Sequence, residues 1–174
     1  SDLVAIVTDQ PLEEALVRFP HIHVIEVDPI NRVHSYHLAY RKLLKSQYSL
    51  LYVLVPDSQH FPSHHIAKEA AAGMQQYIKV IDSKTFGIGL SLLIQELARF
   101  LYQRHPKLSE FESRMNTYIQ NLRFWVVPDA IHNVEDWFWF KQMLKHRVSQ
   151  KNIGDDLVPL LEFHHPIGLL GTGQ

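Results

Sequence analysis

The sequence contains no cysteine, and this absence excludes several classes of functional site. Disulfide bonds, thiol nucleophiles, iron–sulfur clusters and cysteine-based zinc sites all require the missing side chain. A protein without cysteine fits a reducing compartment, so we expect a cytoplasmic location.

Long apolar runs and a strong charge of one sign are also missing. No apolar segment approaches the ~18–20 residues that a membrane-spanning helix needs, and no signal-peptide pattern opens the sequence. The formal net charge is −1, which gives no general attraction to nucleic acid. The densest basic cluster, Arg41, Lys42 and Lys45, falls on a helix face that we predict to be solvated. We therefore expect no transmembrane segment and no nucleic-acid partner.

The composition that remains is that of a globular protein. Apolar residues make up 46% of the sequence and charged residues 20%. A chain of 174 residues is long enough for one well-buried domain, or for one lobe and part of another.

Short β-branched apolar runs alternate with helical patterns along most of the chain. The predicted strands are residues 3–7, 21–27, 49–55, 77–81, 124–127 and 157–163, and the predicted helices are 11–19, 33–47, 63–74, 90–101 and 109–122. This alternation is typical of an α/β fold in which a mostly parallel sheet carries helices on both faces. We expect this α/β lobe to span residues 1–128, and residues 129–174 to form part of a second, divergent lobe.

Polar side chains follow three of the predicted strands directly. Thr8 follows the first strand, Ser58 and His60 follow the third, and Ser83 and Thr85 follow the fourth. Because the carboxyl ends of parallel strands meet at one edge of a sheet, these side chains are candidate ligand-binding residues at that edge. The same residue types also serve as helix caps and turn formers, and the sequence alone leaves both readings open.

Residues 80–85, Val-Ile-Asp-Ser-Lys-Thr, with Gly87 and Gly89 behind them, resemble the strand–DSK–helix segment of the DegV family. The Thr-Asp pair at residues 8–9 and the Val-Pro-Asp at residues 127–129 are similar to further parts of the family pattern. The resemblance implies a bacterial protein that binds a long-chain fatty acid between two lobes. It also implies that the protein catalyses no reaction, needs no cofactor or metal, and presents the acyl group to a kinase-like partner.

The family holds the fatty-acid carboxylate with a Thr after the first strand and with the Ser of a Ser-Gly-Thr turn. Thr8 matches the first of these residues. The alanines of the following helix set a register that places Phe61-Pro62-Ser63 over the turn, so Phe61 replaces the key Ser. Candidate replacement donors are Ser58, His60, Ser63 and His64.

Two further positions depart from the family pattern. Gln10 stands where the family has a Ser after Thr-Asp, and Arg147 is the nearest counterpart of the family's Gly-Gly-Arg segment. Because of these departures, the sequence does not determine the identity of the natural ligand.

Two alternatives to lipid binding stay open at this point. The chain would be a degenerate interaction module without a ligand if Phe61 fills the site. It would be a small metal-dependent hydrolase if some of its 12 histidines and the strand-end aspartates form a centre. No complete catalytic motif occurs, so we expect no enzymatic activity. The aromatic run at residues 137–140 is predicted to pack between lobes, or to line a lipid or partner surface.

Overall fold

The computed structural model describes residues 3–12, 16, 18–122, 124–126, 148–153 and 156–163. The chain divides into two compact units, Ser1–Asn121 and Leu122–Gln174. The sequence placed a boundary after residue 128, and the assignment of residues 129–174 to a second lobe stays a prediction.

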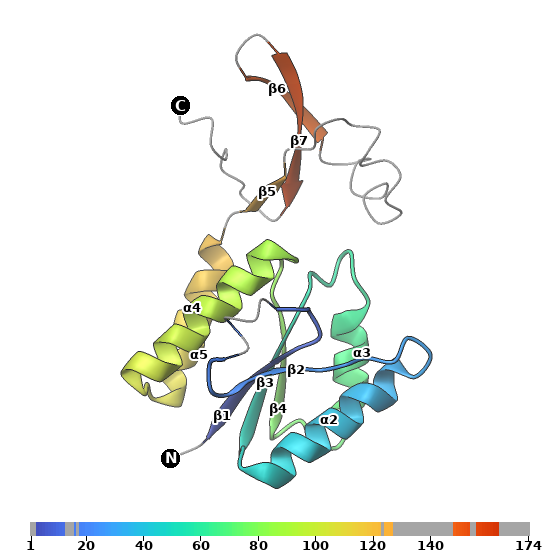
Figure 1. Ribbon diagram of the computed structural model, residues 1–174, viewed down its shortest axis with the longest axis vertical. Helices are drawn as coiled ribbons and strands as arrows, with labels where there is room; N and C mark the ends of the chain where they lie inside the picture. Colours follow the sequence, from blue (N-terminus) through green and yellow to red (C-terminus); the bar gives the residue numbers. More distant parts are fainter. Residues whose placement is uncertain are drawn as a thin grey trace. The chain divides into compact units, whose positions relative to one another are not determined.

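The first unit is built on a parallel sheet of four strands. They are β1 (Val4–Thr8), β2 (Ile22–Val24), β3 (Leu50–Val55) and β4 (Ile78–Asp82), and their order in the sheet is β2-β1-β3-β4 (Figure 1). All six residues of β3 are buried, because β3 is a central strand with both faces covered. The predicted parallel sheet is therefore confirmed.

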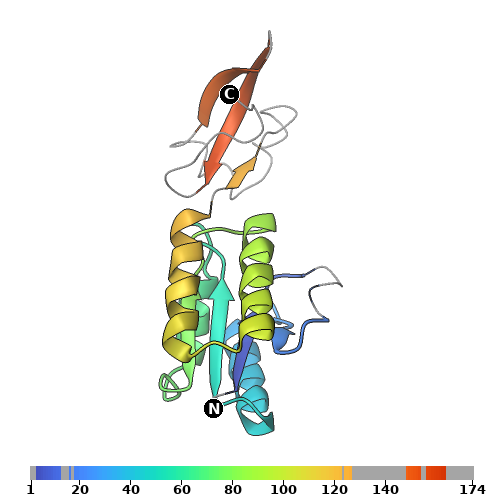
Figure 2. The same cartoon turned by 90° about the vertical axis from the view of Figure 1, so that its left-hand side faces the viewer.

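Helices cover both faces of this sheet. On one face lie α2 (Arg32–Ser46) and α3 (Ser63–Ala70), and on the other lie α4 (Ile88–Arg104) and α5 (Leu108–Asn121) (Figures 1 and 2). This arrangement confirms the α/β fold class with helices on both faces.

Alternate side chains of β3 point to opposite faces of the sheet, so β3 contributes to the apolar core on each face. Leu51 and Val53 belong to the apolar cluster that packs under α2 and α3. Tyr52 points to the opposite face, where its ring meets the ring of Phe111 in α5 edge-on, with centroids 5.0 Å apart. Because a strand alternates its side chains with period two, one apolar run serves both layers.

Some element boundaries differ from the sequence prediction. The helix predicted over residues 63–74 ends at Ala70, and a turn follows in which Gly73 adopts a positive φ of 80°. A glycine tolerates this left-handed conformation, so it allows the chain to turn into β4. The strand predicted over residues 21–27 is confined to Ile22–Val24, where it pairs with β1. The helix predicted over residues 11–19 falls largely outside the described residues.

The second unit contains a small antiparallel sheet. Its strands are β5 (Phe124–Val126), β6 (Val148–Ile153) and β7 (Asp156–Phe163), in the order β5-β7-β6. The sequence predicts residues 124–127 as a strand of the parallel lobe, but β5 pairs antiparallel with β7 in the second unit. Apolar periodicity predicts a strand but does not show which other strand it pairs with.

The strand β6 was missed because its sequence, Val-Ser-Gln-Lys-Asn-Ile, is mostly polar. The Gly154-Asp155 pair between β6 and β7 is a hairpin signal that could have revealed it. The aromatic run at residues 137–140 lies outside the described residues. In the part of the chain that the structure describes, no helix combines the length and the apolar character needed to cross a bilayer.

Candidate functional site

The strand order of the first unit reverses direction at the carboxyl end of β1. Moving outward from β1, the strand β2 lies on one side, and β3 and β4 lie on the other. In open α/β sheets, ligands bind outside the carboxyl ends of the strands at such a reversal of direction. The three loops that follow β1, β3 and β4 meet at this edge.

Side-chain hydrogen bonds tie these loops to one another. The Ser63 hydroxyl, at the start of α3, donates to the Asp9 carboxylate after β1 at 2.9 Å. The Gly87 backbone N–H, at the start of α4, donates to the Gln10 side-chain carbonyl at 3.2 Å. The predicted convergence of the strand ends at one edge is therefore present.

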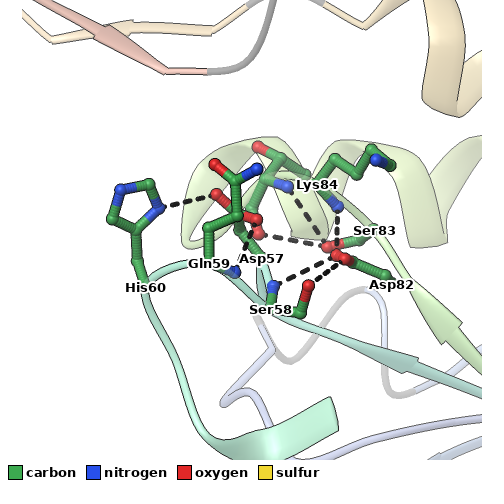
Figure 3. Close-up of polar contacts among 8 residues, drawn as sticks. Asp57, Ser58, Gln59, His60, Asp82, Ser83 and Lys84 are labelled. Carbon is green, nitrogen blue, oxygen red and sulfur yellow. Dashed lines mark hydrogen bonds and ion pairs between the residues drawn. The ribbon is translucent and has the colours of Figure 1, made fainter. Parts of the chain in front are cut away.

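Asp82, at the end of β4, binds the loop after β3 (Figure 3). One carboxylate oxygen accepts the backbone N–H groups of Ser58, at 3.3 Å, and of Lys84, at 2.9 Å. The other oxygen accepts the Ser58 hydroxyl. Lys84 has a φ of 55°, a left-handed conformation that is unfavourable for a residue with a Cβ, and the bond to Asp82 helps to hold it there.

His60 is paired with a different aspartate. Its Nδ1 lies 2.7 Å from the Asp57 carboxylate, and both side chains are more than four-fifths buried, with 18% and 15% exposed. The Gln59 backbone N–H donates to the same carboxylate at 3.1 Å. Figure 3 shows His60 on the opposite side of Asp57 from Asp82. His60 and Ser58 thus serve separate carboxylates in one loop.

Three of the predicted site residues are fully buried hydroxyl side chains: Thr8, Ser83 and Thr85. The Thr8 hydroxyl oxygen accepts the Gln10 backbone N–H at 3.2 Å. The Ser83 hydroxyl donates to the Thr85 carbonyl at 3.1 Å. These two bonds stabilise local turns, the role that such residues most often have. The Thr85 hydroxyl has no hydrogen-bond partner, which is unusual for a buried polar group.

Two tyrosines of α2, Tyr36 and Tyr40, lie near Asp9, and no pattern in the sequence indicates this proximity. Burial and then the Asp9 charge raise the pKa of both hydroxyls. The Tyr36 hydroxyl and the Asp9 Oδ1 atom are buried and lack a hydrogen bond of ordinary geometry. Asp9, which accepts the Ser63 hydroxyl, is therefore a partly buried carboxylate with one buried oxygen and with tyrosine hydroxyls nearby.

Phe61, which the resemblance predicts at the position of the family's carboxylate-binding Ser, packs against another aromatic ring. Its ring centroid lies 5.4 Å from that of Phe86, which precedes α4, and the rings are tilted by 43°. Both side chains are partly buried. An aromatic contact between two loops therefore lies at the position where the resemblance predicts the family's Ser.

The remaining predicted residues contribute less to this edge. His64 is partly buried, and burial lowers its pKa despite the opposing charge of Asp82. Arg147 lies outside the described residues. His21 and His23 both bond to Tyr48 instead of a ligand. Among the described residues, no group of three His, Asp or Glu side chains is arranged to hold a metal ion.

Two surface hollows among the described residues lie away from these loops. One of about 730 Å³ runs between α2 and the end of α3, and includes Ile30, His37 and Glu69 in its lining. Another of about 400 Å³ lies beside the carboxyl-terminal half of α2, with Tyr48 and Met74 in its lining. Neither is lined by a predicted site residue.

Comparison with known proteins identifies the fold. No protein-family model matches the sequence, and no curated protein matches it. Among solved structures, DegV of Bacillus subtilis, described as a fatty acid binding protein, has a TM-score of 0.70 at 14% identity over 95% of this chain and 69% of its own. A DegV family protein from Thermus thermophilus, described by its fatty acid binding, has a TM-score of 0.68 at 12% identity over 92% of this chain and 68% of its own.

A third structure of the same kind is a DegV family protein from Ruminococcus gnavus with vaccenic acid. Its TM-score is 0.60 at 11% identity, over 86% of this chain and 65% of its own. The chain thus spans about two thirds of the length of these structures. The resemblance to the DegV family is therefore confirmed for the fold.

Proposed function

We propose that this protein binds a long-chain fatty acid or a similar lipid and catalyses no reaction on it. The observation that carries the proposal is the shared fold: chains with this arrangement of elements are described as fatty-acid-binding proteins in several bacteria. The loops after β1, β3 and β4 are the proposed site of the polar end of the lipid.

An acyl tail supplies enough free energy for such a function without strong polar contacts. Each buried methylene group contributes about 0.8 kcal/mol, so a long acyl chain contributes roughly ten kcal/mol or more before the unfavourable terms of binding. A neutral hydrogen bond contributes only about 1 kcal/mol. Replacement of one hydroxyl by Phe61 is therefore compatible with lipid binding.

The test is mass spectrometry of the purified full chain, first in the native state and then after organic extraction. We expect one lipid for each protein molecule, and its chain length will give the size of the bound tail. An unrelated soluble protein purified from the same host in the same buffers controls for lipid carried over. A lipid-free mass that stays unchanged after incubation with common fatty acids and their esters would contradict the proposal.

A second candidate function is supported by the Phe61–Phe86 contact. The two rings pack against each other at the position predicted for the family's Ser, and a site filled in this way would make the chain an interaction module without a ligand. Stable association with a protein partner and absence of bound lipid would favour this candidate. The metal-dependent hydrolase is not proposed further, since the described residues offer no group of metal ligands.

The location and the partner follow from the same proposal. A chain without cysteine fits the cytoplasm, where a lipid carrier would pass its cargo to another protein. A kinase-like partner stays a prediction from the resemblance. Co-purification of the tagged chain from its own cells, followed by identification of the bound proteins, would test it.

A further inference from the structure

Three of the hydrogen-bond donors that the sequence predicted for the polar end of a ligand, Ser58, His60 and Ser63, are already engaged. The Ser63 hydroxyl donates to Asp9, and the Ser58 hydroxyl donates to Asp82. The Nδ1 atom of His60 faces Asp57 at 2.7 Å, so it carries a hydrogen that is donated to that carboxylate. None of these three groups offers its hydrogen to a ligand without breaking a bond inside the protein.

Gln10 differs from these three groups because its amide nitrogen has no hydrogen-bond partner in the part of the chain that the structure describes. Its side-chain oxygen accepts the Gly87 backbone N–H at 3.2 Å. A backbone N–H needs an acceptor, so this bond fixes which end of the amide is the oxygen. The amide nitrogen of Gln10 then presents two N–H donors, which have no partner among the residues described. Gln10 is partly buried and lies two residues after the carboxyl end of β1, where the strand order reverses.

The charges of the same loops disfavour an anionic ligand. Residues 8–12, 56–62 and 82–87 contain three aspartates, Asp9, Asp57 and Asp82, against one lysine, Lys84. Lys84 is exposed, so its charge is well screened by water. Moving a carboxylate out of water to a position beside three like charges has a high free-energy cost. The cost of moving an uncharged carbonyl group to the same position is much smaller.

We infer that Gln10 supplies the hydrogen bonds to the polar end of the lipid, and that this end is an uncharged carbonyl group, as in an ester or an amide, instead of a free carboxylate. This inference rests on the proposed lipid binding and narrows its ligand class. A neutral amide donor suits a neutral carbonyl acceptor. The residue that replaces the family's Ser after Thr-Asp thereby becomes a determinant of specificity.

The test is a competition between two lipids with the same tail. The full chain, stripped of lipid, is incubated at about pH 8 with equal amounts of methyl palmitate and sodium palmitate, and the bound lipids are then extracted and counted by mass spectrometry. A carboxylic acid with a pKa near that of a Glu side chain, about 4.3, is ionised at this pH. We expect the ester to be bound at least tenfold in excess.

The decisive variant is Gln10→Glu. It keeps an oxygen that accepts the Gly87 N–H, but it removes both amide donors and adds a charge. We expect its affinity for methyl palmitate to fall about tenfold, with an unchanged circular dichroism spectrum. Gln76→Glu, an exposed position before β4 at the opposite edge of the sheet, adds the same charge and should bind the ester as the wild type does.

Should Gln10→Glu fail to fold, Gln10→Met tests the same point without the added charge. Palmitate bound in excess over its ester would overturn the inference and leave the proposed lipid binding intact. An ester affinity that Gln10→Glu and Gln10→Met both leave unchanged would also overturn it. Binding of neither lipid by the folded wild type would overturn the inference together with the proposed function.

Discussion

Tyr48 joins two histidines through a single hydroxyl group. Its oxygen lies 3.1 Å from His21 Nδ1 and 2.8 Å from His23 Nε2. A hydroxyl has one hydrogen to donate, so at least one imidazole must donate to the oxygen. Burial lowers the pKa of His23, and the neighbouring His21 and Lys42 lower it further. Protonation of His23 is therefore less favourable in the folded protein than in the unfolded chain.

The sign of the resulting pH dependence follows from linkage. Above the pKa of about 6.5 of an unperturbed histidine, both states carry a neutral His23, and the shift has no effect on stability. Below that pH, the unfolded chain binds the proton more readily than the folded protein does. The free energy of unfolding therefore falls as the pH falls through this range.

Replacement of His23 by Gln tests this effect, because Gln is polar but does not titrate. Between about pH 7.5 and pH 5, the His23→Gln variant should lose less stability than the wild type. Because His23 is partly exposed, the difference should stay below about 1 kcal/mol. Urea unfolding midpoints at the two pH values measure it. His34→Gln, an exposed position, should follow the wild type, and equal pH slopes for all three proteins would contradict the prediction.

The sequence predicted which residue types gather at the site but not how they pair. Thr8, Ser58 and Ser63 do lie at one edge, because parallel strands impose that edge. Their hydrogen-bond partners depend on atoms that meet only after folding, such as Ser63 and Asp9, which are 54 positions apart. No periodicity in a single sequence encodes such a pair.

At the scale of elements, one carboxylate connects two loops of the site. Asp82 ends β4, bonds to the backbone of the loop before α4, and also holds Ser58 in the loop before α3. A bond that joins two loops restricts both, so Asp82 should contribute more to stability than an aspartate on a free surface.

We predict that Asp82→Ala lowers the free energy of unfolding by about 1–3 kcal/mol. The substitution removes the acceptor of three hydrogen bonds and releases the left-handed backbone at Lys84. Urea unfolding at neutral pH measures the change. Glu96→Ala is the control: Glu96 forms an exposed ion pair with Arg99 in α4, and its loss should change stability by less than about 0.5 kcal/mol. Equal losses for the two variants would show that Asp82 makes no special connection.

The central elements were predictable because their patterns are strong. Helix α4 has its apolar side chains at helical spacing, and β3 is a continuous β-branched and apolar run. The prediction of elements was poorer where a segment pairs as a strand although its composition is polar. The polar strand β6 pairs along its length with β7, so backbone hydrogen bonding, and not the composition of β6, marks it as a strand.

At the scale of the whole molecule, the first unit has helices packed on both faces of its sheet. One core packs under α2 and α3, and includes Val7, Leu51 and Val53. On the other face, α4 contributes the fully buried Leu93 and Leu97. Residues 1–121 thus bury both faces of their own sheet, which is the requirement for an independently folding domain.

We therefore predict that a chain of residues 1–121 folds on its own. It should show a helical circular dichroism spectrum and a single cooperative urea transition. Its m-value should be smaller than that of the full chain, because the surface exposed on unfolding scales with chain length. Within this shortened chain, Leu97→Ala should destabilise by about 2–5 kcal/mol, since Leu97 is fully buried. Leu92→Ala, with Leu92 47% exposed on the same helix, should have a much smaller effect. A shortened chain without a cooperative transition, or with equal responses to the two substitutions, would mean that the core of the first unit is not sufficient for its fold.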